Sequence, residues 1–196
     1  LRRPYTLWMM HDWMGRLTHM VERGAYGYPH DFIPRRPYTL WMMHDFGGGA
    51  ATGVECVTED ALPAEYRGNL FLADFGKRQV LRVSIERTGA TYRVEKQAGM
   101  FPHPPEDFRP VGLAWSADGR SLLICDWQHR DTKENVKVGR LWQVTCTNAS
   151  AGALKPVWYL DAAMGRAFTA SEADLLQALG HPSRRVRLAA QRALVR

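Results

Sequence analysis

Residues 107–127 read DFRPVGLAWSADGRSLLICDW, and they contain two apolar runs, 111–116 and 121–127, on either side of Asp118 and Gly119. An Asp-Gly pair between two such runs is a strong signal for a tight hairpin turn, because the central positions of that turn need positive φ angles. This stretch therefore predicts two antiparallel strands joined by a short turn.

The same rhythm of short β-branched and aromatic runs extends over residues 54–160, with breaks at Pro63, Gly68 and Gly76. Two groups of four strands are predicted, at 54–58, 69–74, 80–85 and 91–96, and then at 111–116, 121–127, 140–145 and 156–160. Repeated groups of four antiparallel strands are typical of β-propeller blades. The sequence thus predicts a mainly β fold with about two to three four-stranded blades, and an open meander or sandwich is the alternative.

Beyond residue 161 the apolar spacing becomes helical. Ser171, with Asp174 three residues later, predicts a capped helix start, and Gly180 and Pro182 end that helix. Its predicted apolar stripe consists of Leu175, Leu176 and Leu179. The apolar side of a second helix consists of Val186, Ala189, Ala190, Ala193 and Leu194. One such α-α hairpin cannot bury its own apolar face, so we expect further repeats in a longer chain.

Eleven residues, RRPYTLWMMHD, occur twice without a single change, at 2–12 and at 35–45. Repeat folds diverge at their surface positions, so full identity points to a recent duplication or an assembly error rather than to a solenoid. We therefore divide the chain into a duplicated segment that we do not expect to fold (1–12), a partial propeller (13–160) and a helical repeat (161–196).

Composition excludes several classes of protein. Hydrophobic residues make up 45% and charged residues 23% of the chain, which is typical of globular proteins and not of disordered ones. The three cysteines show no metal-binding spacing, and no apolar run is long enough to span a membrane. The glycine-rich run 46–53 lacks phosphate-loop spacing and leads into a strand, so it predicts a close backbone approach instead.

Arginines give the last predicted helix a basic side, which we interpret as a solvated face rather than a nucleic-acid site, because no aromatic residue is interleaved and no nucleic-acid motif accompanies it. These arginines are Arg184, Arg185, Arg187, Arg192 and Arg196.

Three segments carry a family resemblance: GAYGYPHDF at 24–32, EYRGNLFLADFGKRQVLRV at 65–83 and DFRPVGLAWSADGRSLLICDW at 107–127. They resemble the later blades of the quinoprotein glucose/sorbosone dehydrogenase family, whose propellers often use pyrroloquinoline quinone (PQQ) and calcium. The likeness is greatest to a bacterial subgroup described as membrane-bound dehydrogenases, in which HEAT-like repeats and often a cytochrome c domain follow the propeller. LLQALGHPSRRVRLAAQRAL at 175–194 is similar to such a HEAT repeat.

The resemblance implies that Lys77 and Arg109 contact the carboxylates of the quinone, as a lysine and an arginine do in the family. If the resemblance is set aside, we interpret Lys77 as a solvated turn residue and Arg109 as one member of a structural ion pair. Some family members carry a second arginine where this chain has Asp107. The family's general base is a histidine of an earlier blade, and no histidine here falls in a matching motif; His30 is the loop histidine that could approach the propeller axis. The catalytic residues are therefore unknown, and no metal ligand is assigned.

We expect, from the resemblance, a C-terminal fragment of a PQQ- and calcium-dependent dehydrogenase that oxidises a sugar or alcohol and passes electrons to a cytochrome c. The family's members are usually exported, which implies a periplasmic location. The alternative is a non-catalytic propeller and HEAT module that binds a carbohydrate or protein partner.

Asp126 and Trp127 lie at a predicted strand end and could line the pore. We favour the alternative that Asp126 accepts a hydrogen bond from a neighbouring backbone amide and that Trp127 packs between blades.

In an incomplete ring some apolar side chains should be partly uncovered. We expect this of Trp115, Leu122, Ile124, Trp142 and Trp158.

Overall fold

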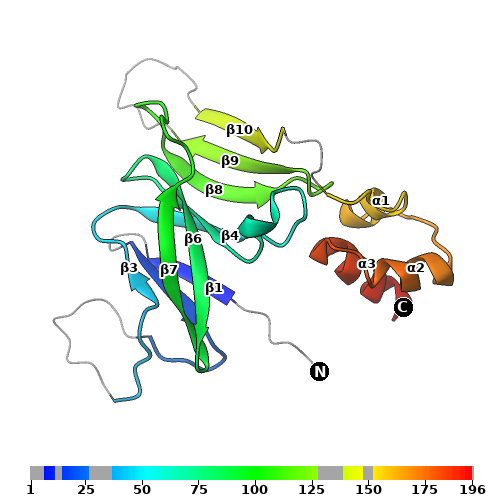
Figure 1. Ribbon diagram of the computed structural model, residues 1–196, viewed down its shortest axis with the longest axis horizontal. Helices are drawn as coiled ribbons and strands as arrows, with labels where there is room; N and C mark the ends of the chain where they lie inside the picture. Colours follow the sequence, from blue (N-terminus) through cyan, green and yellow to red (C-terminus); the bar gives the residue numbers. More distant parts are fainter. Residues whose placement is uncertain (1–6, 12–14, 27–36, 128–138, 148–151, 196) are drawn as a thin grey trace.

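The computed structural model describes residues 7–11, 15–26, 37–127, 139–147 and 152–195. These residues form ten strands in three antiparallel sheets, and three short helices follow the sheets in the chain (Figure 1). The structure confirms the predicted class: a mainly β molecule in which partial propeller-like blades precede a helical segment.

The first sheet has the order β1-β2-β3, and the central sheet has the order β4-β5-β6-β7. The strands of the first sheet are β1 (Leu7–His11), β2 (Arg16–Met20) and β3 (His44–Asp45). The strands of the central sheet are β4 (Ala51–Cys56), β5 (Leu70–Asp74), β6 (Gln79–Thr88) and β7 (Thr91–Gly99), with a short 3₁₀ helix η2 (Ala64–Tyr66) between β4 and β5.

The third sheet has the order β10-β9-β8 and contains the predicted hairpin. Its strands are β8 (Pro110–Trp115), β9 (Ser121–Trp127) and β10 (Gly139–Thr145). The predicted hairpin is present, but its turn differs from the expected two-residue Asp-Gly turn. The backbone N–H of Ser116 donates to the Ser121 carbonyl at 2.8 Å, so four residues, 117–120, connect the strands. Gly119 has the expected positive φ of 70°, whereas Asp118 does not have a positive φ.

The three sheets stack face to face, with the central sheet covered on both sides. All five residues of β5 are buried, because alternate side chains point into two different cores. Phe71 packs against Trp115 and Ile124 of the third sheet, whereas Leu72 packs against Leu17 of the first sheet. The initial strand β4 contacts both β1 and β8, so the first strands of the sheets lie next to one another, as in propeller blades around an axis.

A close backbone approach explains part of the glycine-rich run. A Cβ atom at Gly53 would lie 3.1 Å from the carbonyl oxygen of Val111 and 3.3 Å from the Cα of Gly112. The side chain of any other residue would force β4 and β8 apart, so the predicted role of this run is confirmed at Gly53.

Two helices form the predicted hairpin, and a third precedes it: α1 (Tyr159–Ala163), α2 (Glu172–Ala178) and α3 (Arg184–Leu194). Ser171 and Asp174 form the predicted capping box. Val186 and Ala190 of α3 are fully buried, with Ala189, Ala193 and Leu194 packed against them. The predicted leucine stripe of α2 is wrong in part, because the buried pair is Leu175 and Ala178, whereas Leu176 and Leu179 are exposed. Within the part of the chain that the structure describes, the covered side of α2 is the one that faces α3 and Trp158.

The predicted strand at 156–160 is wrong. Residues 157–158 form a turn and α1 begins at Tyr159, whose backbone N–H donates to Pro156 at 2.9 Å. The apolar residues of this run, Trp158 and Tyr159, pack into the helical core instead of a sheet. The third sheet therefore has three strands among the described residues, rather than four.

The expectation for the duplicated segment also differs from the structure, because residues 7–11 form β1 and pair with β2. The predicted exposure of five apolar side chains is wrong for four of them. Trp115, Leu122, Ile124 and Trp158 are buried, since the stacked sheets and the helices cover them. Trp142 alone of the five remains 37% exposed.

Candidate cofactor-binding rim

The second strands of two neighbouring sheets end in related sequences, LFLADF at 70–75 and LLICDW at 122–127. In each sheet the aromatic residue after the aspartate donates its backbone N–H to the carbonyl of the residue just before the first strand of that sheet. Phe75 donates to Ala50 and Trp127 to Arg109, both at 2.8 Å. Ala50 and Arg109 thus hold equivalent places in two blades. We call this end of the sheets the rim; it comprises 46–50, 74–78, 106–110 and 126–127.

Asp126 accepts hydrogen bonds on both carboxylate oxygens, although it is only 4% exposed. Its Oδ1 accepts from the backbone N–H of Arg109 at 2.7 Å. Its Oδ2 accepts from Nε of Arg140 and from the indole Nε1 of Trp142, both at 2.8 Å. The prediction that Asp126 binds a neighbouring backbone amide is therefore confirmed. The Trp127 ring lies 5.3 Å from the Phe75 ring of the central sheet, so it packs between blades, as predicted.

Asp74 is the equivalent carboxylate of the central sheet and is 1% exposed. Its Oδ1 accepts from the backbone N–H groups of Lys77 at 2.9 Å and of Ala50 at 3.3 Å. Its buried Oδ2 has no hydrogen-bond donor within the described part of the chain, and the Lys77 ammonium lies 3.9 Å from it. A Cβ atom at Gly49 would lie 2.8 Å from both oxygens, so glycine is needed at that position.

Lys77 follows β5 in the turn that leads to β6, and its side chain is 30% exposed. Its Nζ donates to the backbone carbonyl of Phe46 as well as lying near Asp74. The lysine therefore links the glycine-rich segment before β4 to the β5–β6 turn, and it is more than a solvated turn residue.

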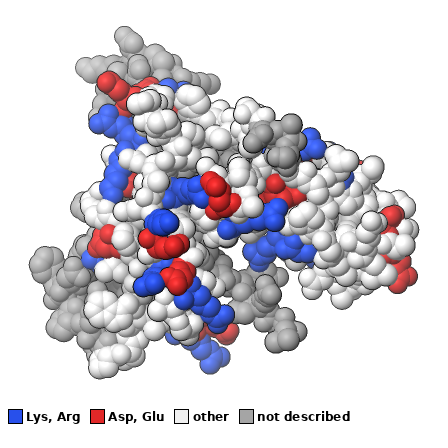
Figure 2. Space-filling view, viewed as in Figure 1, with Lys and Arg blue, Asp and Glu red and all other residues white. Residues whose placement is uncertain are grey.

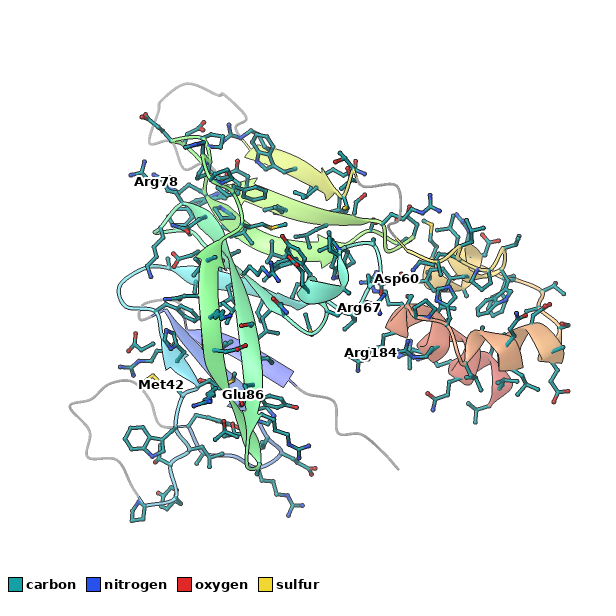
Figure 3. All side chains as sticks on the ribbon, in the orientation of Figure 1. Met42, Asp60, Arg67, Arg78, Glu86 and Arg184 are labelled. Carbon is teal, nitrogen blue, oxygen red and sulfur yellow. The ribbon has the colours of Figure 1, made fainter. Side chains whose placement is uncertain are left out.

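Arg109 lies just before β8, and its guanidinium stands 5.6 Å from the centre of the Phe75 ring. Its Nη1 donates to the carbonyls of Phe108 at 2.9 Å and Glu106 at 3.2 Å. No carboxylate among the described residues lies within ion-pair distance of Arg109, so it does not form a structural ion pair there. Arg78 also donates to the carbonyl of Glu106, at 2.9 Å, and Figure 3 places it at the end of the sheets away from the helices.

The turn that carries Lys77 thus touches the segment that carries Arg109, through Phe75 and Arg78. Both cations belong to one rim and come from adjacent blades. Asp107, which stands where some family members carry an arginine, is partnered by Arg140: Nη2 lies 3.0 Å from Oδ1 and also donates to the backbone carbonyl. The hydrogen bond with Asp107 raises the pKa of Arg140. Arg140 therefore bridges Asp107 and the buried Asp126.

The described residues contain no group of three or more His, Cys, Asp or Glu side chains that could hold a metal ion. His19 contacts Thr91 and Tyr92, and His181 contacts the carbonyl of Leu154, so neither faces the rim. His30 lies outside the described residues, as does Arg196.

Figure 2 shows basic and acidic side chains interspersed over the sheets on the face that it draws. None of the described helices is both long enough and apolar enough to cross a membrane.

Sequence reasoning missed a second charged cluster, at the end of the sheets opposite the rim. Glu59 and Asp60 are 1% and 4% exposed, and Lys155 reaches both, at 3.3 and 2.6 Å. Ser183, the N-cap of α3, donates to Glu59 at 2.7 Å, and Arg185 lies 3.7 Å from it. Figure 3 shows Asp60 beside the helices. This cluster joins the sheets to the helical segment, and its partners lie too far apart in the chain for any local pattern to reveal it.

No protein-family model matches the chain, and no curated protein matches it. Among solved structures, the chain is similar to a crystal structure from Thermus thermophilus that is provisionally described as an oxidoreductase (glucose dehydrogenase). The identity is 17% and the TM-score 0.54. The likeness covers 73% of this chain and 42% of that protein, so the chain spans less than half of its length. At this identity the likeness shows a shared fold.

Proposed function

We propose that this chain is part of a quinone-dependent dehydrogenase that oxidises the carbinol group of a sugar or alcohol. The observation that carries the proposal is the placement of Lys77 and Arg109 on one rim, from adjacent blades, next to the ring pair Phe75 and Trp127. The similarity to the glucose dehydrogenase fold supports the same interpretation.

The rim residues fit PQQ, a planar tricarboxylate. Cations suit its carboxylates and aromatic rings suit its flat faces. Arg109 keeps its guanidinium clear of carboxylates among the described residues, and Trp127 is 45% exposed, so both offer surface to such a ligand. When bound, the quinone supplies the acceptor for the hydride that leaves the carbinol carbon. The described side chains offer no calcium site, and we assign no step to that ion.

The longer protein that this proposal describes would have HEAT-like repeats after the propeller, a cytochrome c as electron acceptor and a location outside the cytoplasm, in the periplasm. The α2–α3 hairpin supports the first of these points, because the side of α2 that bears Leu176 and Leu179 is free to pack against a following helix pair.

A non-catalytic binding module for a carbohydrate or protein is the second candidate, and one contact favours it. The ammonium of Lys77 donates to the Phe46 carbonyl and lies 3.9 Å from the Asp74 carboxylate, so part of its capacity of three N–H donors is already used within the protein. A scaffold would use the lysine only to hold the segment before β4, whereas an enzyme site would also need its remaining N–H donors for the quinone.

Titration of the full-length protein with PQQ and calcium, followed by absorbance, distinguishes the two functions. We expect saturable binding that Arg109→Ala and Lys77→Ala each weaken by about tenfold or more, because each removes a charged hydrogen-bond donor. Arg93→Ala is the matched control, since Arg93 pairs with Glu86 on the outer strands and should leave the affinity unchanged. The absence of any absorbance change with the unaltered protein would eliminate the dehydrogenase function and leave the binding module.

A further inference from the structure

We infer that Asp126 is a positioning residue that holds Arg109 in place for an anionic ligand at the rim. The inference rests on the proposed function for the identity of that ligand, but the positioning itself is a property of the free protein. Asp126 does not touch the ligand in this assignment; it acts through Arg109.

Three donors converge on Asp126 from three segments. The backbone N–H of Arg109 reaches Oδ1 from the start of β8, while Arg140 and Trp142 reach Oδ2 from β10. Arg140 extends the network further, since its second nitrogen binds Asp107, two residues before Arg109. The 107–109 segment is therefore fixed at both of its ends, directly by Asp126 and indirectly through Arg140.

This fixing determines where the guanidinium of Arg109 can lie. Its Nη1 is held by the carbonyls of Phe108 and Glu106, which belong to the same short segment, and its plane lies near Phe75. A side chain anchored on its own backbone moves whenever that backbone moves. The orientation of the guanidinium thus depends on the two oxygens of Asp126.

The burial of Asp126 is compensated by its donors. Removing a carboxylate from water costs free energy, and a buried carboxylate keeps its charge where hydrogen bonds and a cation offset that cost, as the Arg109 N–H, Arg140 and Trp142 do here. An asparagine could not replace it, because donors approach both oxygens. In either orientation its NH₂ group would face the Arg109 N–H or the donors of β10.

Asp74 provides a matched control within the same chain. It occupies the equivalent position of the central sheet and is equally buried, but both of its hydrogen bonds fall on Oδ1 and none falls on Oδ2 among the described residues. Asp74→Asn therefore removes the same buried charge at the same rim while it keeps an acceptor for both backbone amides. The two substitutions separate loss of charge from loss of position.

The experiment compares Asp126→Asn with Asp74→Asn by two measurements. We expect Asp126→Asn to speed amide hydrogen exchange at Arg109 at least tenfold and to weaken PQQ binding about tenfold, with no further loss when it is combined with Arg109→Ala. We expect Asp74→Asn to leave Arg109 exchange unchanged, because the hydrogen bonds of Asp74 reach Ala50 and Lys77 and not the 106–109 segment. Asp161→Asn, at an exposed carboxylate paired with Arg166 in the helical segment, is the control for PQQ binding and should leave the affinity unchanged.

Unchanged exchange at Arg109 in Asp126→Asn would overturn the positioning role, and so would PQQ binding that is unchanged or tighter in that variant. If Asp126→Asn does not fold, Arg140→Gln takes its place, since it cuts the link to Asp107 at a side chain that is 36% exposed, and faster exchange at Arg109 is again expected. If the unaltered protein does not bind PQQ, the proposed function fails, and the exchange rates alone still decide whether Asp126 positions Arg109.

Discussion

Gly119 illustrates how a turn residue at one end of the sheets is constrained by a distant part of the chain. It has a φ of 70°, and a Cβ atom there would overlap the carboxylate of Glu59, which follows β4. Glu59 cannot retreat easily, because Ser183 and Lys155 hold it from the helical side. The glycine is therefore required twice, once by the hairpin turn and once by the buried cluster.

Gly119→Ala should lower the free energy of unfolding by about 3 kcal/mol or more, which combines backbone strain of about 1–2 kcal/mol with displacement of a buried carboxylate. Gly89→Ala is the control, because Gly89 has a similar φ of 58° but a Cβ atom added there would meet nothing within 4 Å. Urea denaturation of both variants measures the difference. Equal losses would mean that Glu59 adjusts without cost and that only the turn matters.

At the scale of single elements, α2 and α3 begin in the same way but in different surroundings. Ser171 and Ser183 are both N-caps whose hydroxyl oxygens accept a backbone N–H, from Asp174 and Val186 respectively. Ser171 is exposed to solvent, whereas Ser183 is fully buried and its hydroxyl also donates to Glu59. The same cap thus has a local role in α2 and a tertiary role in α3.

Ser171→Ala should destabilise the protein by about 1 kcal/mol, the usual effect of losing an N-cap. Ser183→Ala should cost about 1–3 kcal/mol more, because the buried Glu59 loses a donor as well. Chemical denaturation of the two variants, followed by far-ultraviolet circular dichroism, gives the comparison. If the two losses were equal, the Ser183–Glu59 hydrogen bond would contribute nothing to the junction.

At the scale of the whole molecule, the helical segment is attached to the sheets through buried charges rather than through the apolar core alone. Burial raises the pKa of Asp60, but hydrogen bonds from Lys155 and from the backbone N–H of Ala153 outweigh that effect and hold the pKa below its ordinary value of 3.8. Burial also raises the pKa of the Tyr159 hydroxyl, with a smaller contribution from the charge of Glu59. The attachment therefore depends on a carboxylate that must stay ionised.

The lowered pKa of Asp60 determines how the stability of the protein depends on pH. A carboxyl group whose pKa is lower in the folded state stabilises the fold above its unfolded pKa, and that contribution is lost as the pH falls through the folded pKa. The free energy of unfolding, measured from about pH 7 to about pH 3, should decrease once the pH is lowered past about pH 4. Asp60→Asn should show a lower value at neutral pH and a shallower fall. Asp161→Asn, at an exposed carboxylate paired with Arg166, should keep the steep profile; a shallower fall there too would contradict the assignment to Asp60.

Much of the fold follows from local signals. The Asp-Gly turn located the β8–β9 hairpin, the glycine-rich run indicated a close approach, and Ser171 with Asp174 marked the start of α2. Lys77 and Arg109 came from a family resemblance, and whether they bind a cofactor stays a prediction. The aspartates near the ends of β5 and β9 could have been identified from the sequence, since LFLADF and LLICDW align position by position. Their three-dimensional partners could not be found that way, because hydrogen bonds between distant segments have no local pattern.

The two copies of the duplicated segment adopt different secondary structure, although their sequences are identical. Leu7–His11 forms the whole of β1, but the same five residues in the second copy, 40–44, are outside any strand except for His44. The first copy has β2 beside it as an antiparallel partner along its full length, whereas the second pairs with β2 only at His44 and Asp45. Local composition determined that both copies could be extended. Tertiary structure decided which one is a strand, because a strand is stable only when another backbone satisfies its N–H and carbonyl groups.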